Sequence, residues 1–253
     1  MRKANGNPPI GQCRLCLKER PLHESHLMPR ALYAHGRRKI TFATRSLSGS
    51  NPKEIKANLL CLDCEQRFNG YGESEVLKWL APKSIRRFPL HDRLRVACPC
   101  EDFPTLSVFK CRDVGVDAAK FTYFTLSVVW RMTIHDWVGF DDRVLPRWNL
   151  GTFGEQLRGF LVGDEAFPPD TAVFVIVCTD SYSREFWTAP ASDVVCNCLG
   201  FEFLARGVYF RALMGKHLPP DSHTLSCALP YERITYGHCR NLTIEKLKVF
   251  VPF

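Results

Sequence analysis

Two pairs of cysteines in this chain have the spacing of a metal site. Cys13 and Cys16 form one C-x-x-C pair, and Cys61 and Cys64 form the other. Each pair can bring both sulfur atoms to one ion from a single tight turn, and two pairs complete the tetrahedral shell of structural zinc. Unliganded thiols or a redox-active pair are the alternatives, because redox motifs share the C-x-x-C spacing. The paired spacing predicts one structural zinc ion.

The composition describes a globular chain with no membrane-spanning segment. Of its 253 residues, 45% are hydrophobic and 24% are charged, which suffices for one or two packed domains. No run of about eighteen uncharged apolar residues is present, and the start lacks the apolar segment of a secretory signal. We therefore expect a cytoplasmic protein, in which cysteines are metal ligands or buried thiols rather than disulfides. The eight cysteines outside the two pairs are expected to be buried, with the C-x-C pairs at 98–100 and 196–198 as the exceptions to consider: Cys98, Cys100, Cys111, Cys178, Cys196, Cys198, Cys227 and Cys239.

Positive charge is concentrated in the first part of the chain. Residues 1–97 hold 19 Lys and Arg against 8 Asp and Glu, whereas residues 98–253 hold 15 against 18. This asymmetry favours a polyanion-binding module at 1–97 joined to a nearly neutral domain at 98–253, and a merely solvated basic surface is the alternative.

Periodicity and turn residues predict a mixed α+β fold. The helical candidates are the run that follows Cys64 and ends at Pro82, residues 117–137 as a core helix, and residues 154–163. The strand candidates are residues 39–46, 171–178 and 242–253, and residues 201–215 read as a hairpin turned at Arg206-Gly207. Arg131 is expected to pair with Asp117 or Asp136, and a phosphate contact is the alternative.

The motifs resemble those of the HNH, or ββα-metal, nucleases. The similar residues are the two C-x-x-C pairs, "ESHLMPRAL" at 24–32 and "NLLCLDCEQRFNGYGE" at 58–73. The likeness to a bacterial branch of this family continues into residues 126–137 and 151–164. It implies a zinc-clamped ββα-metal module in which the histidine before the x-x-Pro turn is the general base.

That resemblance assigns roles to particular residues of this chain. His26 would take a proton from the water that attacks a phosphodiester bond. The basic residues that follow the motif would contact the nucleic-acid backbone: Arg30, Arg37, Arg38 and Lys39. A structural histidine, a zinc-binding histidine in a Cys₃His shell, and a solvated basic loop are the alternatives.

The catalytic metal site departs from the family pattern. Most members have Asp, His or Glu before the base as a metal ligand, whereas this chain has Ser25 there. Glu24 would point to the opposite face of a strand. Most members also have Asn after the second zinc-pair cysteine and His or Lys three residues later, where this chain has Glu65 and Phe68. The substitutes at helical spacing are Glu65, Asn69 and Glu73, whose oxygen atoms suit Mg²⁺ or Mn²⁺, although a solvated carboxylate face is the alternative.

The resemblance leads to one main functional expectation and two rivals. We expect a metal-dependent endonuclease that acts on DNA, with RNA not excluded, and the family's settings suggest a role in phage defence. The first rival is an inactive zinc module that binds nucleic acid, favoured by Ser25 at the ligand position. The second is an adaptor that recruits a protein partner through residues 98–253.

Overall fold

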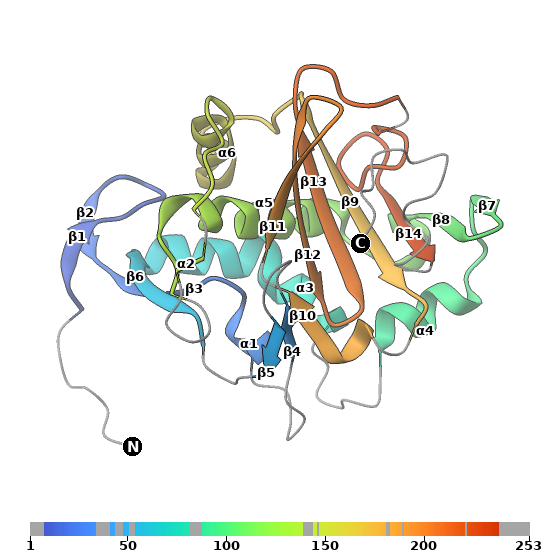
Figure 1. The fold of residues 1–253 in the computed structure, drawn as a ribbon, viewed down its shortest axis with the longest axis horizontal. Helices are drawn as coiled ribbons and strands as arrows, with labels where there is room; N and C mark the ends of the chain where they lie inside the picture. Colours follow the sequence, from blue (N-terminus) through green and yellow to red (C-terminus); the bar gives the residue numbers. More distant parts are fainter. Residues whose placement is uncertain are drawn as a thin grey trace.

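A mixed ten-stranded β-sheet and a set of helices on one of its faces form the framework of the chain (Figure 1). The structure is a computed structural model, and it describes residues 8–33, 41–43, 48–50, 54–80, 88–138, 144–145, 147–180, 183–188, 190–220 and 222–237. The predicted α+β class is confirmed.

The large sheet has the strand order β5-β4-β10-β12-β13-β9-β14-β8-β7, and β11 also pairs with β12. Neighbouring strands are antiparallel except for β10 with β4 and β14 with β9, which are parallel. Its strands are β4 (Thr41–Ala43), β5 (Ser48–Ser50), β7 (Glu101–Phe103), β8 (Leu106–Lys110), β9 (Thr171–Cys178), β10 (Phe186–Thr188), β11 (Ala191–Val195), β12 (Cys198–Ala205), β13 (Val208–Met214) and β14 (Arg233–Gly237).

The central strands follow the sequence pattern closely. Strand β9 coincides with the predicted run 171–178, and every residue in it is buried, because its alternate side chains belong to two different hydrophobic clusters. Strands β12 and β13 form the predicted hairpin. Arg206 and Gly207 in its turn both have positive φ, 49° and 81°, which matches the twist of a two-residue hairpin loop.

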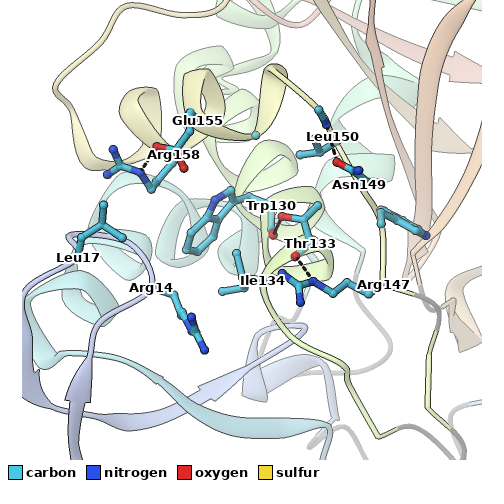
Figure 2. A pocket seen from close by; sticks show the side chains of 13 residues that line it. Arg14, Leu17, Trp130, Thr133, Ile134, Arg147, Asn149, Leu150, Glu155 and Arg158 are labelled. Atoms are coloured by element: carbon cyan, nitrogen blue, oxygen red, sulfur yellow. Dashed lines mark hydrogen bonds and ion pairs between the residues drawn. The ribbon is translucent and has the colours of Figure 1, made fainter.

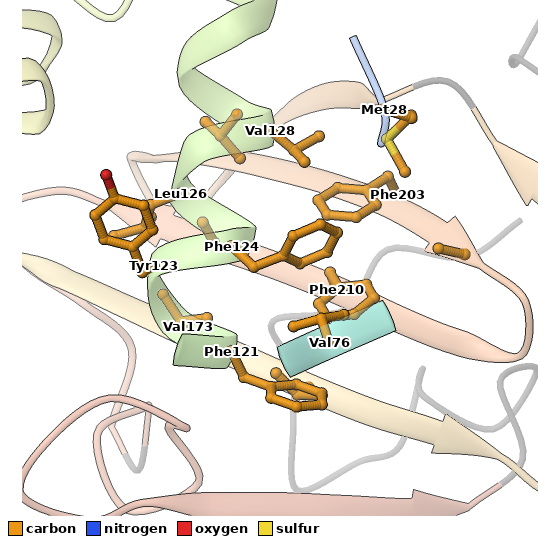
Figure 3. Close-up of a cluster of buried hydrophobic side chains, with 14 of the residues drawn as sticks. Met28, Val76, Phe121, Tyr123, Phe124, Leu126, Val128, Val173, Phe203 and Phe210 are labelled. Atoms are coloured by element: carbon orange, nitrogen blue, oxygen red, sulfur yellow. The ribbon is translucent and has the colours of Figure 1, made fainter. Parts of the chain in front are cut away.

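The long helix α5 (Ala118–Ile134) is the core helix that the sequence predicts. Asp117 caps its start by accepting a hydrogen bond of 3.1 Å from the backbone N–H of Lys120. Figure 3 shows Phe121 and Phe124 of this helix packed over Phe203 and Phe210 of the β12–β13 hairpin. Aromatic side chains of this size supply much of the apolar area that a core buries.

The helical run predicted after Cys64 is continuous but not regular. It consists of α2 (Leu62–Phe68), the π-helical turn η1 (Asn69–Glu73) and α3 (Ser74–Leu80). A Cβ atom at Gly72 would lie 2.9 Å from the backbone nitrogen of Phe124, so a glycine lets η1 approach α5 this closely.

Two smaller two-stranded sheets are formed by the N-terminal segment. Strand β1 (Ile10–Gln12) pairs with β2 (Glu19–Pro21), and β3 (His23–His26) pairs with β6 (Lys56–Leu60), both antiparallel. The remaining helices are α1 (Arg30–Tyr33), α4 (Pro89–Val96) and α6 (Phe153–Val162), with the short 3₁₀ helices η2 (Cys111–Val114) and η4 (Ser183–Glu185). Helix α6 confirms the prediction at 154–163.

The packing crosses the predicted boundary near residue 97. One buried cluster contains Leu27 and Phe68 from the first segment and Phe124 and Phe210 from the second. Strands β4 and β5 also join the large sheet through β10. The division into 1–97 and 98–253 as separate units stays a prediction.

Some sequence predictions fall wholly or partly outside the described residues. The strand expected at 242–253 lies outside them, and only Thr41–Ala43 of the strand expected at 39–46 is described. Within the described parts of the chain, no helix combines the length and apolar character needed to cross a bilayer.

Candidate metal centre and catalytic cluster

The four paired cysteines meet at one point of the fold. Their sulfur atoms all lie within 4.8 Å of one another, and the Cys16 and Cys61 sulfurs are 3.9 Å apart. A zinc ion with bonds of about 2.3 Å separates tetrahedral ligands by about 3.8 Å, so these four thiols can hold such an ion. A structural metal such as zinc therefore fits the described side chains.

The local backbone explains how the two pairs come together. Cys13 begins the turn between β1 and β2, which is closed by hydrogen bonds from the N–H of Leu17 to the Cys13 carbonyl and from the N–H of Cys13 to the Lys18 carbonyl, both 2.9 Å. Cys61 directly follows β6 as the N-cap of α2, and Cys64 lies in the first turn of that helix. A bound ion would link the β1–β2 ribbon to the start of α2.

The pKa values of the Cys13 and Cys64 thiols are shifted in opposite directions. A hydrogen bond with Cys64 lowers the pKa of Cys13 to about 4, despite its burial. The same hydrogen bond, followed by burial, raises the pKa of Cys64 far above its ordinary value. A group in which the Cys13 thiolate is favoured while Cys61 and Cys64 keep their protons releases those protons when a metal binds.

Strands β3 and β6 and helix α2 form a strand–strand–helix unit beside this centre. In the strand pair, Ser25 lies opposite Ala57 and His26 lies opposite Lys56. Successive side chains of a strand point to opposite faces. Ser25 accordingly is buried against α2, whereas Glu24 is exposed and pairs with Lys56 at 2.8 Å.

His26 is held by a carboxylate that sequence reasoning missed. Its Nε2 atom lies 3.1 Å from Oε2 of Glu54, and the other carboxylate oxygen accepts a hydrogen bond of 3.2 Å from Arg30. The hydrogen bond with His26, and then that with Arg30, lowers the pKa of Glu54. Because an ionised carboxylate only accepts, Nε2 carries the ring hydrogen and Nδ1 is the basic nitrogen.

The second half of the cluster lies on the inner face of β3. The hydroxyl of Ser25 donates a hydrogen bond to Oε1 of Glu65 on α2. Burial raises the pKa of Glu65, opposed by the charge of Arg131 and by this hydrogen bond. Ser25 occupies the position at which most family members have a metal ligand, and Glu65 is a predicted metal ligand. In the structure these two residues are hydrogen-bonded to each other.

Arg131 pairs with Glu73, which corrects the expected pairing with Asp117 or Asp136. Its Nη2 atom donates to Oε1 of Glu73, and the guanidinium carbon lies 4.6 Å from the centre of the Phe68 ring. Asp117 is engaged elsewhere, as the N-cap of α5 and partner of Lys120. Arg131 therefore links α5 to the end of η1, instead of pairing with Asp117 or Asp136 at the ends of its own helix.

The π-helical turn brings Glu65 and Glu73 into one electrostatic cluster, although they are eight positions apart. Both are half-buried, and burial raises the pKa of Glu65, with a smaller contribution from the charge of Glu73. Asn69, the third predicted ligand, is exposed at the start of η1. The wider π turn changes the angular spacing that a regular α-helix would impose on these three residues.

The donor set of this cluster does not fit a catalytic Mg²⁺ or Mn²⁺ ion as the sequence pattern predicted. Within the part of the chain that the structure describes, the four paired cysteines are the one group of three or more His, Cys, Asp or Glu arranged so that it could hold a metal. Glu65 is bound to Ser25 and Glu73 to Arg131, whose fixed positive charge would repel a cation nearby. A divalent ion would have to displace both internal partners.

Other predicted site residues have mixed outcomes. Arg30 is exposed at the edge of the His26 cluster, while Arg37, Arg38 and Lys39 lie outside the described residues. The expectation that the other cysteines are buried thiols is confirmed for Cys111, Cys198 and Cys227. Cys178 is buried as well, but it is disulfide-bonded, which corrects the expectation of a free thiol at this position. The expected burial is wrong for Cys98, Cys100 and Cys196, which lie exposed, and Cys239 lies outside the described residues.

Comparison with family models, curated proteins and solved structures finds no match to this chain. The site is therefore characterised by its own geometry. That geometry is a four-cysteine centre next to a strand–strand–helix unit, with one histidine oriented by Glu54 and two carboxylates held by Ser25 and Arg131.

Proposed function

We propose that the chain is a hydrolase of nucleic-acid phosphodiester bonds, with His26 as the general base. The observation that carries the proposal is the 3.1 Å hydrogen bond between His26 and Glu54. A histidine oriented by a carboxylate is the arrangement that positions a base toward water, and a mere binding module has no need of it.

The chemistry follows from the tautomer that Glu54 selects. Nδ1 of His26 accepts a proton from a water molecule, and the water oxygen attacks phosphorus. The bond to the leaving ester oxygen breaks, and that oxygen takes a proton from solvent. Glu54 stabilises the imidazolium that forms, as carboxylate partners of catalytic histidines do.

Positive side chains next to His26 suit a phosphate-bearing substrate. The side chain of Arg30 is 75% exposed, and Lys56 lies across the strand pair from His26. The sequence adds Arg37, Arg38 and Lys39 shortly after Arg30. Such groups bind the nucleic-acid backbone without reading its sequence, so we propose DNA or RNA as the polyanionic substrate. Binding is expected to weaken steeply with salt, because neutralised phosphates release counterions.

The experiment is a nicking assay on supercoiled plasmid, repeated with a labelled RNA, using the zinc-loaded full chain. Each substrate is tested with Mg²⁺, with Mn²⁺ and with EDTA. The exposure to EDTA is kept short so that the zinc ion stays bound. Substrate cleavage that is lost in His26→Ala supports the proposal. The matched control is His23→Ala, which removes a histidine from the same strand and should cut like the wild type. Equal cutting by His26→Ala and the wild type would overturn it.

A second candidate function is nucleic-acid binding without cleavage. It is favoured by the internal engagement of Glu65 and Glu73, which leaves the predicted ligands of a catalytic metal already paired. The same assay separates the two candidates. A wild-type chain that binds the plasmid with a steep salt dependence, yet cuts neither substrate under any metal condition, would make this second function the better one.

A further inference from the structure

Three arginines are buried among the residues that the structure describes, and two of them have carboxylate partners. Arg131 pairs with Glu73, and Arg211 pairs at 2.9 Å with Asp193. The third, Arg206, is 9% exposed, and no carboxylate of the described chain pairs with it. Burying a charge is costly unless a partner compensates it, so Arg206 is the exception that needs an explanation.

Arginines at the surface of this protein also have internal partners. Figure 2 shows Arg147 and Arg158 at a cavity between α5 and α6. Nε of Arg147 donates a hydrogen bond of 2.8 Å to the carbonyl of Thr133, and Nε of Arg158 donates one of 2.8 Å to Glu155. By contrast, Nε of Arg206 is fully buried and has no hydrogen-bond partner within the described chain. Burial lowers the pKa of Arg206, and no described carboxylate offsets this effect.

The backbone position of Arg206 is also unusual for its side chain. It lies in the β12–β13 turn with φ of 49°, a left-handed conformation in which two-residue loops favour Gly, Asn or Asp. A residue held in a sparsely populated conformation is a reason to look for a function there. Nε is the guanidinium nitrogen that is fully buried without a partner, so the terminal nitrogen atoms are those that a ligand can reach.

A second arginine lies beside the same turn. A Cβ atom at Gly207 would lie 2.9 Å from Cγ of Arg184 and 3.4 Å from Cζ of Phe88, so the side chain of Arg184 runs past the turn. Its guanidinium carbon lies 5.3 Å from the centre of the Phe88 ring, and its Nε atom is also buried without a hydrogen-bond partner in the described chain. The sequence adds three basic residues in "KSIRRF" at 83–88. This concentration of positive charge favours a polyanion over a single carboxylate.

The turn is connected to the His26 cluster through two aromatic rings. The ring centroid of Tyr33 lies 6.2 Å from that of His26 and 5.1 Å from that of Trp187 on β10. Trp187 is paired with Ala205, the residue before Arg206, so β10 lies beside the β12–β13 turn (Figure 1). A nucleic-acid strand has a phosphate about every 3.4 Å along the axis of a duplex, so one strand offers phosphates to both places.

We propose that Arg206, with Arg184 beside it, binds a backbone phosphate of the nucleic-acid substrate, away from the phosphodiester that His26 attacks. The choice of ligand rests on the proposed function, whereas the need for an anion rests on the buried charge itself. A guanidinium offers several donors in the geometry that phosphate oxygens accept. The phosphate thus supplies the negative charge that no described carboxylate provides, and the contact positions the strand without reading its sequence.

The experiment measures affinity by fluorescence anisotropy on the zinc-loaded full chain carrying His26→Ala, so that cleavage cannot consume the probe. The probes are a labelled DNA strand, its duplex and an RNA strand of the same sequence. Adding Arg206→Gln should weaken binding about tenfold or more, because it removes a hydrogen bond to a charged group. It should also reduce the slope of log affinity against log salt by about one, the share of one phosphate contact. Arg184→Gln should weaken binding in the same direction.

The matched control is Arg112→Gln, which removes the same charge and should leave affinity near that of the parent chain. Its side chain is 73% exposed, and it lies in η2 at the opposite end of β14 from the β12–β13 turn. Melting temperatures without nucleic acid test the fold. Arg206→Gln should not lower the melting temperature, because it breaks no internal pair, whereas Arg131→Met breaks a buried pair and should lower it.

Competitors identify the ligand. Unlabelled strand should displace the probe at far lower concentration than inorganic phosphate or polyglutamate. Inorganic phosphate that competes as well as the strand would overturn the strand as the source, and polyglutamate that does so would overturn the assignment to phosphate.

The variants decide the role of Arg206. The proposal is overturned if Arg206→Gln binds like Arg112→Gln, or if it lowers the melting temperature as much as Arg131→Met. Weaker binding by Arg206→Gln, together with a wild-type chain that cuts nothing in the nicking assay, would support this site while the hydrolase proposal fails. Cleavage that depends on His26, together with unchanged binding by Arg206→Gln, would do the reverse.

Discussion

Arg131 and Glu73 form an ion pair that joins the long helix α5 to the end of the π-helical turn η1. The side chain of Arg131 is 2% exposed and that of Glu73 is 16% exposed, so both charges are largely removed from water. Arg131 also contributes positive charge to the environment of Glu65. The negative charges of Glu65 and Glu73 are thus stabilised by Arg131, a residue of the chain itself.

We predict that Arg131→Met lowers the free energy of unfolding by about 3–5 kcal/mol, because it leaves Glu73 without its partner in a half-buried place. Urea denaturation of the zinc-loaded protein measures this loss. The double variant Arg131→Met with Glu73→Gln should lose less than the sum of the two single variants. Strict additivity would mean that the pair contributes no coupling.

The zinc centre gives a second prediction. Freshly purified protein should contain one zinc ion per chain, and Cys61→Ser should lose it together with the folded N-terminal segment, because metal binding here is part of folding. Elemental analysis and circular dichroism provide the measurements. Cys98→Ser is the control, since this exposed cysteine lies outside the four-sulfur group. Wild-type soluble protein free of zinc would contradict the assignment.

Two neighbouring glycines give a third prediction. Gly72→Ala should destabilise the protein by about 1–3 kcal/mol, because its Cβ would lie 2.9 Å from the backbone of Phe124, which cannot move away cheaply. Gly70 is in the same π-helical turn, but a Cβ atom there would have no neighbour within 4 Å, so Gly70→Ala should not lower stability. Denaturation midpoints of the two variants decide the matter, and equal losses would argue against the close approach of η1 to α5.

The two carboxylates of the cluster should respond to pH in opposite directions. Hydrogen bonds lower the pKa of Glu54, so its contribution to stability is present above about pH 4.5 and is lost as the pH falls through the folded value. Burial raises the pKa of Glu65, so its contribution is present at low pH and is lost as the pH rises through the folded value.

The test is the stability difference between the wild type and each glutamine variant at pH 7 and at a pH below 4.5. On acidification, the excess in free energy of unfolding of the wild type over Glu54→Gln should shrink. The free energy of unfolding of the wild type relative to Glu65→Gln should increase. Differences are compared because acid also protonates the zinc thiols in every variant. Shifts of the same sign for both variants would contradict this description of the cluster.

Local patterns in the sequence predict much of the central fold. The buried run of β9, the Arg206-Gly207 turn and the apolar helix α5 each follow from residues that are neighbours in the chain. The C-x-x-C spacing likewise predicts the four-cysteine cluster, because ligand geometry restricts where such pairs can lie.

Long-range pairing is what the sequence does not reveal. Glu54 reaches His26 only because β3 and β6 pair in a particular register, and a long insertion separates the two strands. Arg131 and Glu73 are 58 positions apart, so helical spacing carries no information about their contact. The π-helical turn could not be predicted from the sequence either. Gly70 and Gly72 are compatible with a weakened α-helix as well as with a π-helical turn.

The last prediction concerns turnover by the proposed hydrolase. His26→Ala should lower the cleavage rate by about 10²–10⁴-fold, the usual contribution of a positioned base, while zinc content and nucleic-acid affinity stay near those of the wild type. Glu54→Gln should lower the rate less, because it keeps a hydrogen-bond partner for the ring but loses the negative charge that stabilises the imidazolium. Rates from initial nicking velocities and affinities from filter binding at fixed salt separate turnover from binding. An unchanged rate in Glu54→Gln would leave Glu54 without a part in orienting the base. A loss in His23→Ala as large as in His26→Ala would remove the special role of His26.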